Sequence, residues 1–159
     1  MRAHSTLVLI LAASGMAFSQ GAVAAGPDAT LWNGTWHLNA AKSKFASPGK
    51  EASETRSYYL SGGKLTVKSS SKDPAGKELQ FSYSAAFDGK FYPMTGNPNA
   101  DSISLTAVSA HEIKATSKLK GNVSVQSTAT VAADGKHLTL RRKMLRIKGA
   151  PTDVLEFDR

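Results

Sequence analysis

The chain has no cysteine among its 159 residues. It therefore has no disulfide, no thiolate metal ligand and no cysteine nucleophile, and its stability must come from core packing. Only 8% of the residues are aromatic and 20% are charged, but 41% are hydrophobic, which is too apolar for a disordered chain. Helical periodicity is almost absent after residue 54, which argues against a coiled coil or helical bundle. The composition fits one folded, basic domain.

The N-terminus has the features of a targeting segment. Arg2 and His4 precede an apolar run at 7–13 that is too short to cross a membrane, and Ala22-Val23-Ala24 supplies the small residues that signal peptidase accepts. We therefore expect residues 1–24 to be a signal peptide and residues 25–159 to form a single domain, exported to the periplasm or secreted. A buried N-terminal helix is the alternative, but glycine and polar residues between the apolar run and the cleavage site would interrupt it.

Glycine followed by lysine ends four stretches that have the composition of tight turns. Glycine supplies the positive φ that hairpin turns need, and in three of the stretches an Asp is placed to hydrogen-bond local amides. The four are Ser61-Gly62-Gly63-Lys64, Asp73-Pro74-Ala75-Gly76-Lys77, Asp88-Gly89-Lys90 and Asp134-Gly135-Lys136. Each is predicted to reverse the chain, as are residues 109–111 and 120–122.

Apolar and polar residues alternate with a period of two between these turns. This pattern is typical of antiparallel strands with one buried face. In residues 122–131, for example, it places Val123, Val125 and Ala129 on the inner face. Strands are predicted at 31–38, 54–60, 64–69, 78–87, 90–94, 102–107, 112–119, 122–131, 137–147 and 153–158.

About ten strands joined by short hairpins predict an all-β fold, an antiparallel up-and-down meander. A flat sheet of this size would leave two open edges and an uncovered apolar face, with no helix to cover it. We therefore expect the meander to close into a barrel, with a two-sheet β-sandwich as the alternative. The irregular stretch 39–53 has room for one helical turn and would cap one barrel end, with Phe45 as a plug.

The segment Trp32-Asn33-Gly34-Thr35-Trp36 resembles the Gly-x-Trp opening of lipocalins and fatty-acid-binding proteins, which are calycin-type barrels. In that superfamily the Trp closes one barrel end and packs on a cation from the last strand. The resemblance thus implies a lipocalin-like barrel that is closed by Trp36 and Arg159. Residues 33–45, 92–101 and the final strand also resemble small exported bacterial barrels of unassigned function. The helical lid and the Arg-x-Tyr carboxylate-binding pair of fatty-acid-binding proteins have no counterpart in the sequence.

Motifs for catalysis are missing. His37, His111 and His137 lie in or beside different predicted strands without metal-ligand spacing. The sequence has neither a Gly-x-Ser-x-Gly elbow nor a phosphate-binding glycine-rich loop, and no spacing among its carboxylates selects a glycosidase pair. We therefore expect a protein that is not an enzyme and that has no cofactor and no metal.

The positive charge is concentrated in residues 111–148, which hold nine Lys and Arg against two acidic residues. The rest of the expected mature chain carries no net charge. A basic surface on these strands would attract anionic lipid, polysaccharide or an acidic protein. Aromatic residues that would stack bases are absent from this stretch, which argues against nucleic acid. The alternative interpretation is a basic face that only keeps the protein soluble.

One cation near the end of the ninth predicted strand is expected to face the interior. Leu140 and Arg142 are two residues apart and so share the inner face of the strand. Leu145, an odd-numbered residue, would then face outward. A one-residue bulge between 140 and 145 would turn this leucine inward. A bulge after residue 142 points Arg142 inward, and a bulge before it points Lys143 inward. Neither points inward if the register ends at Leu140. An inward cation needs a buried tyrosine, a carboxylate or a bound anion as its partner.

Small inward side chains on neighbouring strands would leave room for a ligand, or would allow a flattened barrel to pack tightly. Aromatic side chains are expected on the opposite wall. The candidate ligand-binding residues are Arg142, Lys143, Tyr59, Phe81, Tyr83, Phe87, Ser117 and Ser127.

The sequence therefore predicts an exported, non-catalytic protein that binds a small apolar or amphipathic molecule, with the inward cation favouring an anionic one. The alternative is a protein-interaction module, either an inhibitor or an envelope-associated factor, that docks an acidic partner through the basic strands 111–148. The interior volume of the barrel discriminates between the two, because a docking module needs no cavity.

Overall fold

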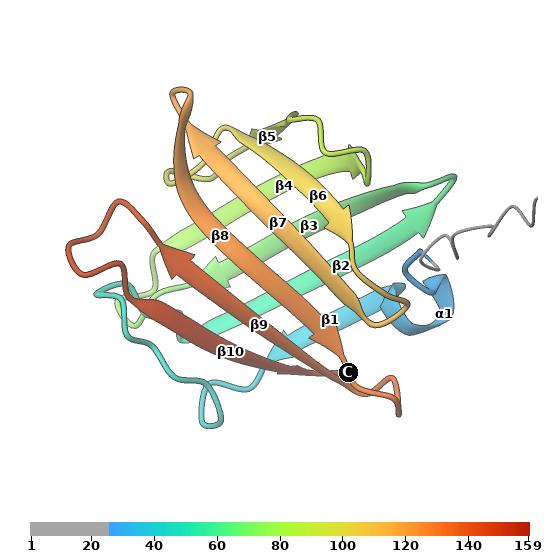
Figure 1. Cartoon of the computed structure of the whole chain (residues 1–159). Helices are drawn as coiled ribbons and strands as arrows, with labels where there is room; N and C mark the ends of the chain where they lie inside the picture. Colours follow the sequence, from blue (N-terminus) through green and yellow to red (C-terminus); the bar gives the residue numbers. More distant parts are fainter. Residues whose placement is uncertain (1–25) are drawn as a thin grey trace, which may run out of the picture.

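The computed structural model describes residues 26–159, which form a closed antiparallel β-barrel of ten strands (Figure 1). Each strand pairs with the next along the chain, and the first pairs with the last. This confirms the predicted all-β up-and-down barrel over the β-sandwich. The predicted signal peptide, residues 1–24, lies outside the described residues. The strands are β1 (Gly34–Leu38), β2 (Ser53–Ser61), β3 (Lys64–Lys72), β4 (Glu78–Ala86), β5 (Tyr92–Thr95), β6 (Ser102–Ala107), β7 (Glu112–Leu119), β8 (Asn122–Val131), β9 (His137–Met144) and β10 (Thr152–Asp158).

The first predicted strand is wrong at its start, where the structure has a short helix, α1 (Ala29–Trp32). Asp28 caps this helix, because its side chain accepts a hydrogen bond from the backbone N–H of Thr30 at 2.9 Å. Gly34 then turns the chain into β1 with a φ of +141°, a conformation that favours glycine. No helix among residues 26–159 has the length and apolar character needed to cross a membrane.

The two-residue turn at Gly62 and Gly63 fixes which side chains of β2 and β3 face inward. It pairs Leu60 with Leu65 directly across the hairpin, and Tyr58 with Val67 two residues further on. Directly opposite residues of an antiparallel pair lie on the same face of the sheet. Every even-numbered residue of β2 from 54 to 60 therefore faces the barrel interior.

The predicted bulge in β9 is wrong, because β9 pairs with β10 without interruption from residue 137 to residue 143. Leu145 does not follow the alternation of inward and outward side chains because the strand ends one residue earlier, at Met144. A register shift occurs instead between β7 and β8, where Ser117 pairs with Val125 but Lys118 pairs with Val123. The extra residue turns Val123 outward, so its predicted inward orientation is wrong, and its side chain is 39% exposed.

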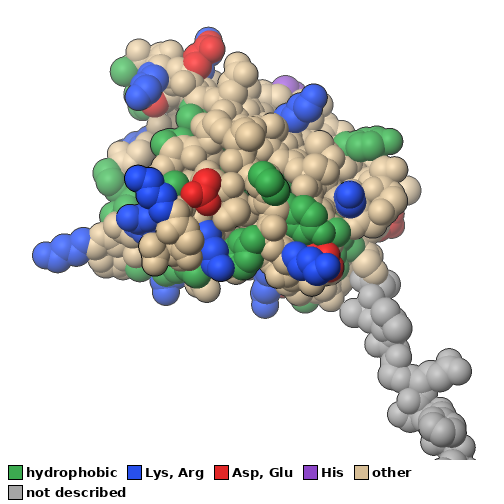
Figure 2. Space-filling model, turned by 90° about the horizontal axis from the view of Figure 1, so that it is seen from above, with side chains coloured by type: hydrophobic (Ala, Val, Ile, Leu, Met, Phe, Trp, Pro, Cys, Tyr) green, Lys and Arg blue, Asp and Glu red, His purple; other side chains and the backbone are tan. Residues whose placement is uncertain are grey.

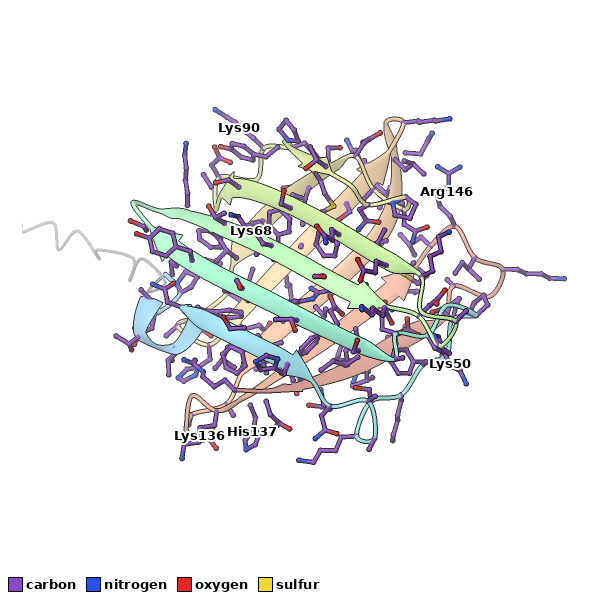
Figure 3. The ribbon with its side chains drawn as sticks, turned by 180° about the vertical axis from the view of Figure 1, so that it is seen from behind. Lys50, Lys68, Lys90, Lys136, His137 and Arg146 are labelled. Carbon is purple, nitrogen blue, oxygen red and sulfur yellow. The ribbon has the colours of Figure 1, made fainter. Side chains whose placement is uncertain are left out.

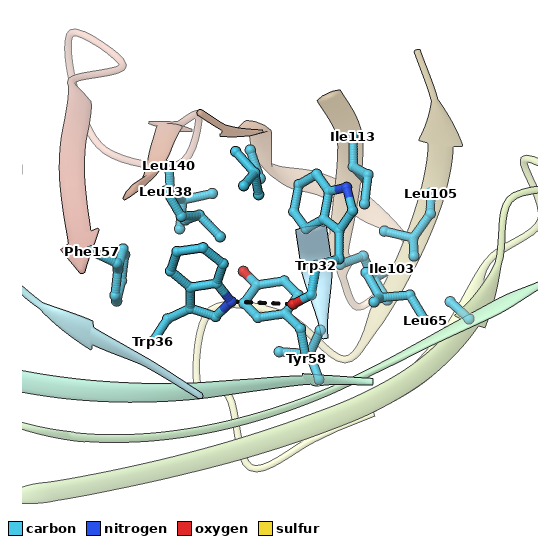
Figure 4. Close-up of a cluster of buried hydrophobic side chains, with 14 of the residues drawn as sticks. Trp32, Trp36, Tyr58, Leu65, Ile103, Leu105, Ile113, Leu138, Leu140 and Phe157 are labelled. Atoms are coloured by element: carbon cyan, nitrogen blue, oxygen red, sulfur yellow. Dashed lines mark hydrogen bonds between the residues drawn. The ribbon is translucent and has the colours of Figure 1, made fainter. Parts of the chain in front are cut away.

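The barrel end next to α1 is closed by two fully buried indoles, shown among apolar side chains in Figure 4. Trp36 donates its ring N–H to the carbonyl oxygen of Trp32 at 3.2 Å, and Trp32 donates its own to the carbonyl oxygen of Ala110 at 2.9 Å. The guanidinium carbon of Arg159 lies 4.1 Å from the centre of the Trp36 ring. Arg159 also donates to the carbonyl oxygens of Asn33 and Leu31, which ties the chain end to α1.

The opposite barrel end is formed by longer loops. Because the strands alternate in direction, the loop before β2, the β3–β4 turn, the β5–β6 loop and the β9–β10 loop all lie there. Within residues 39–52, the backbone N–H of Ser43 bonds the carbonyl oxygen of Asn39 at 3.1 Å, which forms the one expected helical turn. Lys44 then pairs with Val154, which fastens this loop to β10.

Candidate functional site

The barrel encloses a cavity of about 440 Å³. This volume lies within the range of ligand-binding pockets for small molecules. The wall near α1 is apolar and includes Trp32, Leu65 and Ile113. At the other end the lining comes from the loops, which we call the mouth: residues 47–51, the β3–β4 turn, residues 97–99 and the β9–β10 loop. Figure 3 shows Lys50 and Arg146 at the mouth end of the barrel, and Lys136 and His137 at the closed end.

Five of the eight predicted ligand-binding residues line this cavity. Phe81 and Tyr83 come from β4, Ser117 and Ser127 from β7 and β8, and Arg142 from β9. Burial raises the pKa of Tyr83 above its ordinary value, so its hydroxyl stays protonated at alkaline as well as neutral pH. The cavity thus combines aromatic and small hydroxyl side chains on facing walls.

Three predicted residues do not line this cavity, so their expected inward placement is wrong. Tyr59 points outward and is 62% exposed, because its neighbour Tyr58 takes the inward position. Phe87 lies beyond the end of β4 and lines a separate depression near α1. Lys143 is exposed on the outer face of β9. Phe45 packs against the core without lining the cavity, so it is not a plug.

The inward cation is Arg142, and its partners are two carboxylates. Its Nε donates to Asp153 Oδ2 at 3.0 Å, and its terminal nitrogens lie 2.8 and 2.9 Å from the carboxylate oxygens of Glu51. Although burial alone would lower it, the hydrogen bond and negative charge of Glu51 raise the pKa of Arg142. The guanidinium is therefore neutralised within the protein, and the reason for expecting an anionic ligand no longer holds.

A second inward cation, Arg56, is not among the residues predicted from the sequence to line the cavity. Its side chain is 9% exposed, and its Nε donates to Oε1 of Glu54, which also accepts a hydrogen bond from Ser69 Oγ at 2.6 Å. The guanidinium carbon lies 5.3 Å from the ring centre of Phe81 and 5.5 Å from that of Phe157. Burial alone would lower the pKa of Arg56, but the charge of Glu54 raises it above its ordinary value. This ion pair is therefore a fixed part of the cavity wall.

Glu54 has one oxygen that remains without a partner. Its side chain is 2% exposed and lines the cavity. Among the buried side-chain nitrogen and oxygen atoms of residues 26–159, only Glu54 Oε2 has no hydrogen-bond partner. A buried acceptor left in this condition costs about 1–3 kcal/mol of stability. Because Glu54 is a lining residue of the cavity, this oxygen is a candidate contact for a ligand.

The signal for these residues was present in the two-residue turn. Because Gly62 and Gly63 pair Leu60 with Leu65, the even-numbered residues of β2 must share the inner face. That face carries Glu54 and Arg56, whose charges make the strand look exposed. Hydrophobicity alone therefore suggested an inward Tyr59, which the register excludes.

The outer basic surface is smaller than the sequence indicates. Arg142 is absent from it, since its charge is used inside the barrel. On the outer face Lys114 and Arg141 flank Thr128 in register across β7, β8 and β9. Exposed lysines also occur outside these strands, and Figure 2 shows Lys and Arg side chains at several places on the face seen from above.

Within residues 26–159 no group of three or more His, Asp or Glu side chains is arranged to hold a metal ion. His137 Nδ1 lies 2.7 Å from Asp158 Oδ1, and His111 Nδ1 lies 3.1 Å from the carbonyl oxygen of Val131. Comparison with models of protein families and with curated proteins finds no match to the chain. The geometry of the cavity is therefore the basis for assigning a function.

Proposed function

We propose that this protein binds a small apolar or amphipathic molecule inside its barrel without transforming it. The observation that carries the proposal is the cavity of about 440 Å³, because a barrel that served only as a docking module would need no interior space. Its apolar wall near α1 suits a hydrocarbon or ring system. Its polar groups lie toward the mouth, where they can contact the polar end of an amphipathic ligand.

We further propose that the chain is an exported, lipocalin-like barrel of the calycin type, acting in the periplasm or after secretion. The contact between Trp36 and Arg159 supports the first part, since it joins the Gly-x-Trp opening to a cation just after the last strand. The signal-peptide pattern in residues 1–24 supports the second. Detection of the mature protein, beginning at Ala25, in a periplasmic or extracellular fraction would test export.

Filling the cavity is expected to block binding. Ser127 lines the cavity from β8, so Ser127→Trp places an indole inside the barrel. We expect the affinity for Nile red, an uncharged apolar dye that fluoresces in apolar surroundings, to fall by at least about tenfold, or about 1.4 kcal/mol. Fluorescence titration measures this effect.

The matched control is Gln126→Trp, which adds the same indole at the neighbouring exposed position. This variant should bind the dye as the wild type does. Circular dichroism and urea unfolding establish that both variants fold. Equal dye affinity in Ser127→Trp and the wild type, or no dye binding by the wild type, would contradict the proposed function.

The second candidate function is docking to an acidic partner through the basic strands. It is favoured by the exposed cations Lys114 and Arg141, which lie in one row across three strands. Replacing both with Gln is expected to weaken salt-sensitive binding to an acidic protein, or to anionic lipid or polysaccharide, and to leave dye binding unchanged. Measurement at low and high salt separates this surface effect from binding in the cavity.

A further inference from the structure

Glu54 indicates what the polar end of the ligand must be. Its Oε1 accepts hydrogen bonds from Arg56 and Ser69, and its Oε2 accepts none although the side chain is almost fully buried in the cavity wall. A carboxylate oxygen is only an acceptor. The group that completes this site must therefore be a hydrogen-bond donor.

The charges of Glu54 and Arg56 lie beside Oε2 and act against a charged ligand group there. Arg56 is paired with Glu54, and Arg142 is paired with Glu51 and Asp153. A ligand anion at Oε2 would meet the negative charge of Glu54, whereas a ligand cation there would lie close to the guanidinium of Arg56. Burying an unpaired charge is also costly in itself. An uncharged hydroxyl group avoids both repulsions and supplies the missing donor.

We propose that the ligand is an apolar molecule with an uncharged hydroxyl group, which donates a hydrogen bond to Oε2 of Glu54; this inference rests on the proposed function of the cavity. The direction of β2 sets the orientation of the ligand. The strand begins at the mouth and runs toward α1, so Glu54 lies nearer the mouth than Tyr58 does. The hydroxyl group binds near the mouth, and the apolar part extends toward the buried ring of Trp32.

Four probes, each with a chain of ten carbons, test this assignment in the wild-type protein. Decanol, decyl methyl ether, decanoate and decylammonium are each titrated against bound Nile red. Decanol and the ether both have an uncharged oxygen, but only decanol has a donor. We expect decanol to bind at least about tenfold more tightly than each of the other three, which corresponds to about 1.4 kcal/mol.

Glu54→Gln changes the acceptor into a donor with little change of shape. Because Arg56 and Ser69 both donate to one oxygen, the carbonyl oxygen of the glutamine keeps that position and its NH₂ group replaces Oε2. Decanol and the ether can both accept from this NH₂ group. The preference for decanol over the ether is therefore expected to fall below about threefold. Glu112→Gln, on β7 and away from the cavity lining, should retain the full preference.

The outcomes separate this inference from the proposed function. Dye binding with equal affinities for decanol and the ether would overturn the hydroxyl assignment and leave the cavity-binding function standing. Tightest binding of decanoate or decylammonium would overturn it in favour of a charged ligand. An unchanged decanol preference in Glu54→Gln would also overturn it. If no dye or probe enters the wild-type barrel, both proposals fail. If Glu54→Gln does not fold, the wild-type comparison of decanol with the ether decides alone.

Discussion

Replacing Trp36 with alanine is expected to lower the free energy of unfolding by about 3–5 kcal/mol, the range for removing a large aromatic side chain from a core. The indole is fully buried, its N–H bonds the carbonyl oxygen of Trp32, and the guanidinium of Arg159 lies over its ring. The variant therefore loses buried apolar area, one hydrogen bond and a cation–π contact together. Equilibrium unfolding in urea, followed by circular dichroism, measures the loss.

Tyr59→Ala is the matched control for Trp36→Ala. Tyr59 is also a large aromatic residue on a neighbouring strand, but it is 62% exposed. Its replacement should change the free energy of unfolding by no more than about 0.5 kcal/mol, as is usual for surface substitutions. A loss below about 1 kcal/mol for Trp36→Ala would show that the indole does not close the barrel.

The strands were predictable because their signals are local. Three predicted strands, at 102–107, 112–119 and 122–131, agree with β6, β7 and β8 at both ends, since short turns flank a clear period-two pattern. Closure of the barrel was predictable because the sequence has no helix long enough to cover the face of an open sheet. The start of β1 was not predictable in this way, because α1 has only four residues and so has no helical periodicity.

The candidate site was predictable only where the alternation continued without interruption. Phe81 and Ser127 follow the period of β4 and β8 and do line the cavity. Glu51, one of the two partners of Arg142, could not be deduced, because it comes from an irregular loop 91 residues away in the chain. The bulge in β7 and β8 has no glycine or proline to mark it, so the orientation of Val123 could not be found from its pattern either.

The ion pair of Glu54 and Arg56 illustrates a different limit. Charged residues are usually exposed, so the sequence of a strand that alternates charged with small polar residues indicates no buried face. Only the hairpin register, which is a property of two strands together, places both charges inside. The buried charges therefore become recognisable when strand pairing is considered before hydrophobicity.

Arg142→Met is expected to destabilise the fold by about 3 kcal/mol, at the lower end of the range for breaking a buried ion pair. The substitution keeps the bulk of the side chain and leaves two carboxylates without their cation. Asp153 is fully buried and loses the bond from Nε, whereas Glu51 is 18% exposed and can be partly solvated. The free energy of unfolding in urea at neutral pH measures this effect.

Lys143→Met is the control for Arg142→Met, because it removes a cation from the next residue of the same strand, on the exposed face. It should change stability by no more than about 0.5 kcal/mol. The pH dependence gives a second check. Burial alone would raise the pKa of Asp153, but hydrogen bonds from Ser47 and Arg142 hold it below 3.8. A carboxylate with a lowered pKa stabilises the fold at pH values above its ordinary pKa, and this stabilisation is lost as the pH falls through the lowered pKa.

The difference in stability between the wild type and Arg142→Met should therefore be largest at neutral pH and shrink as the pH falls through the lowered pKa of Asp153, because the protonated carboxyl group no longer attracts the guanidinium. Loss of packing alone would give a difference that does not change with pH. If Arg142→Met were as stable as Lys143→Met at neutral pH, the carboxylates would not depend on Arg142. The expectation of a ligand anion beside that guanidinium would then regain its basis.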